Sequence, residues 1–159
     1  LMQAAGRAGR GAAMGARSQM WVQTWNPRHP LFAALAKHDY AAFAASQLKD
    51  REGAGLPPFA HLALLRAEAK DAAVAHGFLR AATQAAAALP QSAGVTIYPP
   101  VPPVVQRVAD VERVQMLMES ASRTALQNML AVLQPELLRL RSAHRGLTRW
   151  AIDVDPLAI

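Results

Sequence analysis

The feature that constrains the fold most is a switch in hydrophobic period that recurs along residues 56–159. Extended segments, in which apolar residues alternate or follow prolines, take turns with segments whose apolar residues recur at helical spacing. Along the chain the predicted order is strand, helix, strand, strand, helix, strand. This order predicts an α+β fold, in which a small, mostly antiparallel sheet packs both helices on one face.

The segments of this part have clear boundaries. "LPPFAHLALLRAE" is predicted to be extended after Pro57 and Pro58, and Asp71 is predicted to cap an alanine-rich helix that runs to Leu89. "GVTIYPPVPP" is predicted as a strand that breaks into a proline-rich turn or edge. We expect "ERVQMLMES" and "TRWAIDVDP" to be the central strands of the sheet.

The second helix is predicted to begin at Ser122 and to present a long apolar stripe to the core. We expect it to be interrupted, or to restart, at Pro135, because proline lacks the N–H that a helix interior uses. The methionines of the preceding strand are interpreted as core filling. The predicted core residues of this helix and that strand are Leu126, Met129, Leu130, Leu133, Leu137, Leu140, Val114, Met116 and Met118.

The segment before residue 56 has a different pattern. Alternation from Met20 to Trp25 predicts a strand that runs into the turn "NPRHP", and its tryptophans are predicted to be core residues rather than base-stacking ones. Asp39 is predicted to cap a helix that ends at Gly53 and Gly55. We therefore expect three parts, residues 1–30, a helical connector at 31–55, and a compact domain at 56–159.

Composition limits the class of protein. The chain has 159 residues and is 52% hydrophobic, which is enough for one hydrophobic core. It contains no cysteine, so it holds no disulfide or thiolate metal site. No apolar run is long enough to span a bilayer, and we expect a cytoplasmic protein that does not bind membranes. Because the chain begins at Leu1 and not at methionine, we also expect it to be a fragment of a longer protein.

Positive charge is concentrated in two acid-free stretches. Residues 1–30 contain four arginines and no acidic residue, and residues 137–149 contain four more. Arginine suits polyanions, because its guanidinium group can engage two phosphate oxygens at once. The second stretch is either a nucleic-acid stripe or a solvated helix face with its loop.

The opening "QAAGRAGR" resembles the last conserved motif of superfamily 2 helicases. That motif has the form Gln-x-x-Gly-Arg-x-Gly-Arg, and an arginine presented in this way neutralises the charge that develops during phosphoryl transfer. The resemblance implies catalytic roles for Gln3, Arg7 and Arg10, and contact with ATP phosphates for Gly6, Arg7, Gly9 and Arg10. A disordered Arg-Gly nucleic-acid tail is the alternative interpretation.

The remaining motifs resemble the C-terminal end of the bacterial primosomal replication-restart helicases, the primosomal protein N′ or PriA family, over essentially the whole chain. The resemblance implies that residues 1–30 end the second RecA-like helicase lobe and that residues 56–159 form a domain similar in fold to ribosomal protein S10. The matching residues are Gln23, Thr24, Pro27, His29, Pro30, Asp39, Tyr40, Phe43, Arg51, Leu56, Pro57, Pro58, Phe59, Trp150, Asp153, Asp155 and Pro156.

The resemblance also implies an activity. The whole protein is expected to be an ATP-dependent 3′-to-5′ DNA helicase, an ATP hydrolase that restarts stalled forks and initiates primosome assembly. It is expected to use ATP and Mg²⁺ and to hold zinc in a cysteine-rich region that this chain lacks. The chain has no Gly-x-x-x-x-Gly-Lys-Ser/Thr loop, so we expect it to be inactive alone and to bind none of these cofactors. A free-standing, non-enzymatic nucleic-acid-binding module of S10 type with a basic N-terminal arm, or an RNA helicase tail, are the alternatives.

Two pairs of residues are candidate binding sites. Arg107 and Arg113 keep positive charge in "VVQRVADVER", where the family has a basic glycine-rich loop, and are candidate DNA contacts. "SRTALQ" matches the place where the family has an arginine and a glutamine that bind the C-terminal tail of single-strand-DNA-binding protein, which implies this role for Arg123 and Gln127. Forked and single-stranded DNA and other primosome proteins are the further partners implied.

No metal site is predicted. Asp153 and Asp155 are two apart on a predicted strand and could share a metal, but no third ligand is identifiable, and a structural strand end is the favoured interpretation. The histidines show no ligand spacing.

Overall fold

The computed structural model describes residues 19–157, and this part of the chain divides into two compact units between Ala54 and Gly55. In the first unit, helix α2 spans Pro30–Ala36 and helix α3 spans Tyr40–Gly53. Both have side-chain caps, because His29 Nδ1 accepts from the Leu31 N–H at 3.1 Å and Asp39 Oδ1 accepts from the Ala42 N–H at 2.9 Å. The predicted cap at Asp39 is confirmed, and Gly55 has a φ of +61° after the helix end.

The strand predicted from Met20 to Trp25 is wrong, because residues 19–25 form no strand. A strand is stable only when its backbone groups pair with a neighbour, and no neighbour for this segment is present within residues 19–157. The prediction that its tryptophans lie in a core is also wrong. Trp21 and Trp25 are exposed at 87% and 104% of their reference areas.

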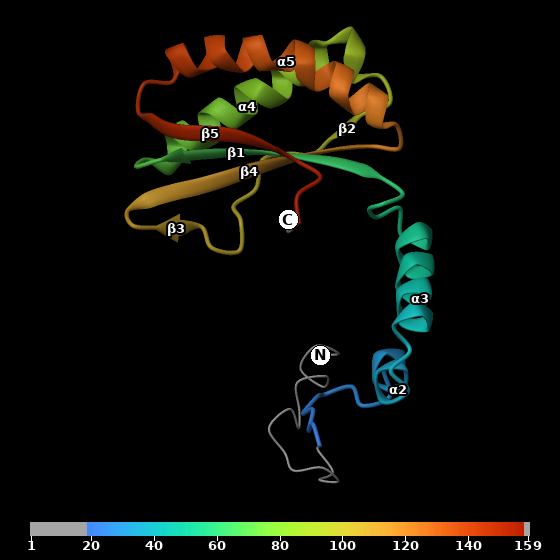
Figure 1. The fold of residues 1–159 in the computed structure, drawn as a ribbon. Helices are drawn as coiled ribbons and strands as arrows, with labels where there is room; N and C mark the ends of the chain where they lie inside the picture. Colours follow the sequence, from blue (N-terminus) through green and yellow to red (C-terminus); the bar gives the residue numbers. More distant parts are fainter. Residues whose placement is uncertain (1–18, 158–159) are drawn as a thin grey trace, which may run out of the picture. The chain divides into compact units, whose positions relative to one another are not determined.

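The second unit is built on one antiparallel sheet (Figure 1). Its strands are β1 (His61–Ala69), β2 (Thr96–Ile97), β3 (Arg107–Val108), β4 (Val111–Ser120) and β5 (Leu147–Val154). The order across the sheet is β2-β4-β1-β5, and β3 pairs with β4. Helix α4 (Ala72–Ala88) follows β1 and helix α5 (Arg123–Ala143) follows β4, with a short 3-10 helix at Pro90–Ser92. The α+β class and the split β-α-β arrangement agree with the prediction, but the order contains one strand more than predicted, because the short strand β3 lies between β2 and β4 along the chain.

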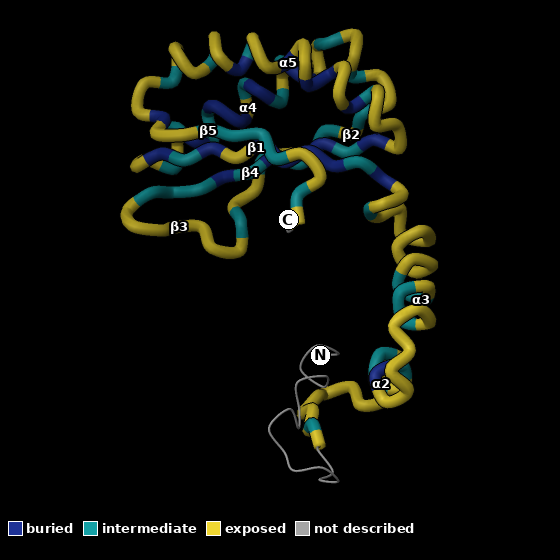
Figure 2. The backbone as a smooth tube through the Cα atoms, viewed as in Figure 1, coloured by how far each residue is buried: buried dark blue, intermediate teal, exposed yellow. Residues whose placement is uncertain are grey.

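Helices α4 and α5 both cover the same face of the sheet, as predicted (Figure 1). Strand β1 contributes alternate residues to that face, and Leu65 lies opposite Met116 on β4 and Ile152 on β5. The buried residues, dark blue in Figure 2, concentrate on α4, α5 and the strands of the sheet. The predicted core is confirmed except that Leu140 is only partly buried, and its members include Phe78, Leu79, Val114, Met116, Met118, Leu126, Met129, Leu130, Leu133 and Leu137.

Helix starts were the most predictable feature. Asp71 accepts from the Ala73 N–H at 2.8 Å and begins α4, and Ser122 accepts from the Ala125 N–H at 3.2 Å and begins α5. These side chains satisfy N–H groups that lack a partner at a helix start. Both predicted caps are confirmed.

Two predictions about this unit need correction. Helix α5 runs through Pro135 without interruption, because its buried stripe of apolar residues continues on both sides of the proline. Pro135 and Ala131 lie on the exposed side of the helix, where water can reach the Ala131 carbonyl that the proline leaves unpaired. Strand β5 is an edge strand and not a central one, because β1 occupies the position beside β4.

Candidate functional site on the open face of the sheet

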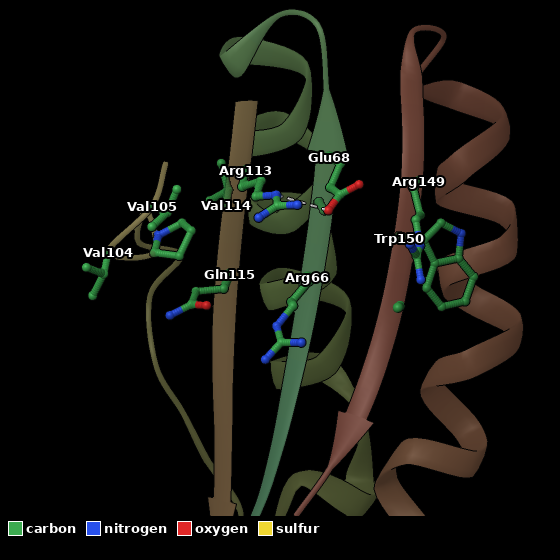
Figure 3. A pocket seen from close by; sticks show the side chains of 12 residues that line it. Arg66, Glu68, Val104, Val105, Arg113, Val114, Gln115, Arg149 and Trp150 are labelled. Atoms are coloured by element: carbon green, nitrogen blue, oxygen red, sulfur yellow. Dashed lines mark ion pairs between the residues drawn. The ribbon is translucent and has the colours of Figure 1, made fainter. Parts of the chain in front are cut away.

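The sheet face that points away from α4 and α5, here called the open face, carries a group of polar side chains. Because side chains alternate along a strand, the neighbours of the core residues Leu65 and Ala67 project to this face. Figure 3 shows Arg66, Glu68, Arg113 and Gln115 on the side of the strands away from the helices. The polar cluster consists of Arg66, Glu68, Arg113, Gln115, Arg149 and Asp153.

The register of the strands brings these residues together. Glu68 on β1 lies opposite Arg113 on β4 and Arg149 on β5, and Arg66 lies opposite Gln115. Residues directly opposite each other on one face are close enough to interact. Glu68 therefore stands between two arginines that are far apart in the sequence.

The carboxylates of the cluster neutralise only part of its positive charge. Arg66 Nη1 lies 3.2 Å from Asp153 Oδ2, and Arg113 Nε lies 3.3 Å from Glu68 Oε1. Arg149 makes no ion pair with any residue of the described range 19–157. Three arginines thus face two carboxylates, which leaves an excess of one positive charge.

The Arg113 Nε–H has no hydrogen-bond acceptor within residues 19–157, although the atom is buried and close to Glu68. The N–H is not directed at the carboxylate oxygen, so the contact is ionic without being a hydrogen bond. A buried donor without an acceptor is unfavourable and rare. Because this atom is buried, another molecule would meet the outer guanidinium nitrogens of Arg113, whose side chain is 40% exposed.

A cavity of about 440 Å³ lies over this cluster. Its floor is the polar cluster without Asp153, and the segment Pro103–Val105 forms an apolar wall (Figure 3). Val104 is almost fully exposed on this wall. The cavity combines guanidinium and amide donors with an apolar rim, which is suited to an anionic group attached to a less polar body.

A second, smaller hollow of about 240 Å³ adjoins Gln115 farther along the open face. It is apolar and is lined by Leu64, Tyr98, Val101 and Leu117 among others. The Tyr98 hydroxyl donates to Glu119 Oε2 at 2.8 Å. This hydrogen bond, with the negative charge of Glu119, raises the pKa of Tyr98 above its ordinary value.

The structure separates the two arginines predicted to contact DNA. Arg107 on β3 is held by Asp110 at 2.7 Å and lies 3.6 Å from Glu112, which offsets its charge. Arg113 belongs to the polar cluster. The turn between β3 and β4 is a two-residue turn in which Ala109 and Asp110 have φ values of +49° and +62°.

Arg123 and Gln127, the predicted tail-binding pair, lie in the first turns of α5 and are both exposed. Their spacing of four places them on one side of the helix. Arg123 Nη2 lies 3.7 Å from Asp155 Oδ2. A carboxylate is therefore already near the guanidinium group that would receive the acidic tail.

The other candidate residues do not gather into a site. Asp153 and Asp155 contact different arginines, Arg66 and Arg123, and Asp155 has a φ of +52° after the end of β5, in agreement with a structural strand end. Within residues 19–157 no group of three metal-ligating side chains is found. The predicted helicase-motif residues Gln3, Gly6, Arg7, Gly9 and Arg10 lie outside the described residues.

Sequence reasoning missed Arg66 and Gln115, and it noted Arg149 only as part of an acid-free stretch. That stretch is not one stripe, because Arg139 lies on α5 beside Glu136 at 3.2 Å while Arg149 lines the open-face cavity. The sequence pattern that could have identified them is the presence of polar residues at alternate positions of a predicted strand, such as Arg66 and Glu68. None of the helices within residues 19–157 has both the length and the hydropathy to cross a bilayer.

Comparison with known proteins gives a consistent result. Residues 52–157 match the family model described as "Primosomal protein N C-terminal domain". "Replication restart protein PriA" of Synechocystis sp. is 34% identical over 160 residues, which cover 100% of this chain and 18% of that protein. The proteins of the same name from Haemophilus influenzae and Treponema pallidum are 34% and 35% identical, over 98% and 81% of this chain and 20% and 19% of their own lengths. The chain thus spans about a fifth of the length of these relatives.

Proposed function

The chain belongs to the primosomal protein N C-terminal domain family and corresponds to the C-terminal portion of replication restart proteins, and from this we propose that it works as part of an ATP-dependent 3′-to-5′ DNA helicase. The whole protein would restart stalled replication forks and initiate primosome assembly in the cytoplasm. The observation that carries the proposal is the family match over residues 52–157, together with relatives that align along essentially the whole chain.

Residues 1–30 would complete the second helicase lobe. Gln3, Arg7 and Arg10 would serve ATP hydrolysis, and Gly6 and Gly9 would let the backbone approach the ATP phosphates. ATP and Mg²⁺ would be held mainly by other parts of the whole protein, since the chain has no phosphate loop. Zinc would be held in a cysteine-rich region of that protein, because this chain contains no cysteine.

Residues 56–159 would form an S10-like module that binds forked or single-stranded DNA and other primosome proteins. The excess positive charge of the polar cluster supports this role, because nucleic-acid binding depends on neutralising phosphates. The side chains on β1, β4 and β5 are better placed for it than Arg107, whose charge is offset by Asp110 and Glu112.

Arg123 and Gln127 would bind the acidic C-terminal tail of single-strand-DNA-binding protein. The tail carboxylate would replace Asp155, whose 3.7 Å contact with Arg123 is longer than a good charge-assisted hydrogen bond. In the whole protein, Arg123→Ala should weaken binding of a tail peptide by about 1.5–3 kcal/mol, the range for a hydrogen bond to a charged group. Unchanged affinity in Arg123→Ala and in Gln127→Ala, measured by fluorescence polarisation, would remove this role.

The alternative, a free-standing nucleic-acid-binding module, is not favoured, because relatives that align with the whole chain are about five times as long. The main experiment is DNA-stimulated ATP hydrolysis by the whole protein carrying Arg10→Ala. Loss of a transition-state arginine should lower turnover by on the order of a thousandfold and change DNA affinity much less. Arg17→Ala, which removes the same charge outside the motif, is the matched control. Near-normal turnover of the Arg10→Ala variant would exclude Arg10 from the chemistry.

A further inference from the structure

We propose that the open-face cavity is a phosphate-binding site in which Arg113, Arg149 and Gln115 hold one backbone phosphate of a DNA strand, and in which Glu68 competes with that phosphate. The proposal rests on the proposed function for the source of the phosphate. The site itself rests on the contacts of the polar cluster.

The first argument is unused donor capacity at one place. The Arg113 side chain is 40% exposed and has only Glu68 as an ion-pair partner within the described residues, Arg149 has no ion pair there, and both line the same cavity as Gln115. Arg113 and Arg149 lie on either side of β1, so their backbones are separated by two strand spacings, about 10 Å. Long side chains from these two positions can converge on a group above Glu68.

The second argument concerns the kind of anion. Arg113 and Gln115 on β4 and Arg149 on β5 bring several N–H donors to one cavity, and a phosphate offers several oxygen acceptors around one centre, whereas a carboxylate offers only two. The wall formed by Val104 and Val105 gives an apolar surface beside the charged floor, against which a sugar or base could lie. The cavity of about 440 Å³ is large enough for a small ligand group and is open to solvent from the open face.

The third argument concerns Glu68. The register places Glu68 directly between Arg113 and Arg149, and its carboxylate lies 3.3 Å from Arg113 Nε without accepting a hydrogen bond from it. Glu68 therefore offsets the charge of Arg113 but makes no ion pair with Arg149. A phosphate would bind the exposed outer guanidinium nitrogens of Arg113, and like-charge repulsion from Glu68 would reduce its affinity.

The test is binding of a fluorescein-labelled oligothymidylate to the 159-residue chain, followed by fluorescence anisotropy at two salt concentrations. Arg149→Gln and Arg113→Gln should each weaken binding about tenfold, the loss expected for one hydrogen bond to a charged group. Each should also make the salt dependence less steep, by about 0.7 in the log–log slope. Arg141→Gln, which removes the same charge from an exposed position on α5, should change affinity less than twofold.

Removing the competing carboxylate gives the sharpest outcome. Glu68→Gln should tighten oligothymidylate binding severalfold, although it removes a partner of Arg113. Glu136→Gln is the matched control, because it frees Arg139 on α5 in the same way and changes the net charge equally. Thermal melting followed by circular dichroism must show that every variant is folded.

Equal tightening by Glu68→Gln and Glu136→Gln would overturn the proposal, since it would show a general charge effect. Equal weakening by Arg149→Gln and Arg141→Gln would overturn it for the same reason. In a separate arm, inorganic phosphate should displace the oligothymidylate only at high concentration. Inorganic phosphate that binds tightly to a chain with no affinity for oligothymidylate would reject a DNA phosphate as the ligand. If Glu68→Gln leaves oligothymidylate affinity unchanged while the whole protein retains DNA-stimulated ATP hydrolysis, the proposed phosphate site is refuted and the proposed function is not.

Discussion

Replacing Pro135 by alanine should stabilise the unit formed by residues 55–159. Pro135 lies inside the continuous helix α5, where it offers no N–H to the Ala131 carbonyl. An interior proline costs a helix about 3 kcal/mol relative to alanine, and its rigidity in the unfolded chain recovers about 0.4–1 kcal/mol. Pro135 is exposed, so alanine creates no cavity in the core.

The expected net gain is therefore about 2 kcal/mol, which should raise the melting temperature of a domain of this size by roughly 10 °C. Thermal unfolding followed by circular dichroism at 222 nm measures it, with Gln134→Ala as the control that alters an exposed neighbour without restoring a backbone hydrogen bond. An unchanged or lower melting temperature in Pro135→Ala would refute the reasoning. It would mean that a bend at Pro135 is needed to keep Leu133 and Leu137 in the core.

Two further predictions concern the loops and edges of the sheet. Ala109→Gly should raise the free energy of unfolding by up to about 1.5 kcal/mol in urea titrations, because a left-handed backbone at φ +49° costs alanine about 1–2 kcal/mol and glycine loses only about 0.5–1 kcal/mol through chain entropy. A loss of stability would contradict this account of the turn. Because the pKa of Tyr98 is raised, its hydrogen bond to Glu119 stabilises the fold below the ordinary tyrosine pKa of 10.0, and this stabilisation is lost as the pH rises through the folded-state pKa. The wild type should therefore lose more stability above pH 10.0 than Tyr98→Phe does. Identical pH profiles of stability for the two proteins would contradict this role of the hydrogen bond.

Local chemistry made several features predictable from the sequence. Asp39, Asp71 and Ser122 cap helices because a short polar side chain can bond the N–H groups two or three residues ahead, whatever surrounds it. The stripe on α5 was also predictable, because its spacing alone determines which side is apolar.

Non-local pairing was not predictable in the same way. Strand β5 has an apolar pattern that suits a central strand, yet β1 takes the place beside β4, because strand order depends on how the helices connect the strands. The segment from Met20 to Trp25 has a strand pattern but lacks a partner within the described residues. An alternating sequence pattern does not show which other segment will pair with the strand.

The candidate site shows the same limit. Arg66, Arg113 and Arg149 are separated by 47 and 36 positions in the sequence, and only the register of three strands brings them to one cavity. The sequence drew attention to Arg107 beside Arg113, but Asp110 and Glu112 offset its charge in the folded hairpin. Sequence proximity was therefore a poor guide to which charges act together.

The most direct test of the central claim is to measure ATP hydrolysis, with and without forked DNA, for the whole protein and for the 159-residue chain side by side. If the chain is the C-terminal portion of a replication-restart helicase and lacks the phosphate loop, the whole protein should show DNA-stimulated ATP hydrolysis and the chain alone should show none. Absence of DNA-stimulated hydrolysis in the folded whole protein, or hydrolysis by the chain alone, would contradict the account.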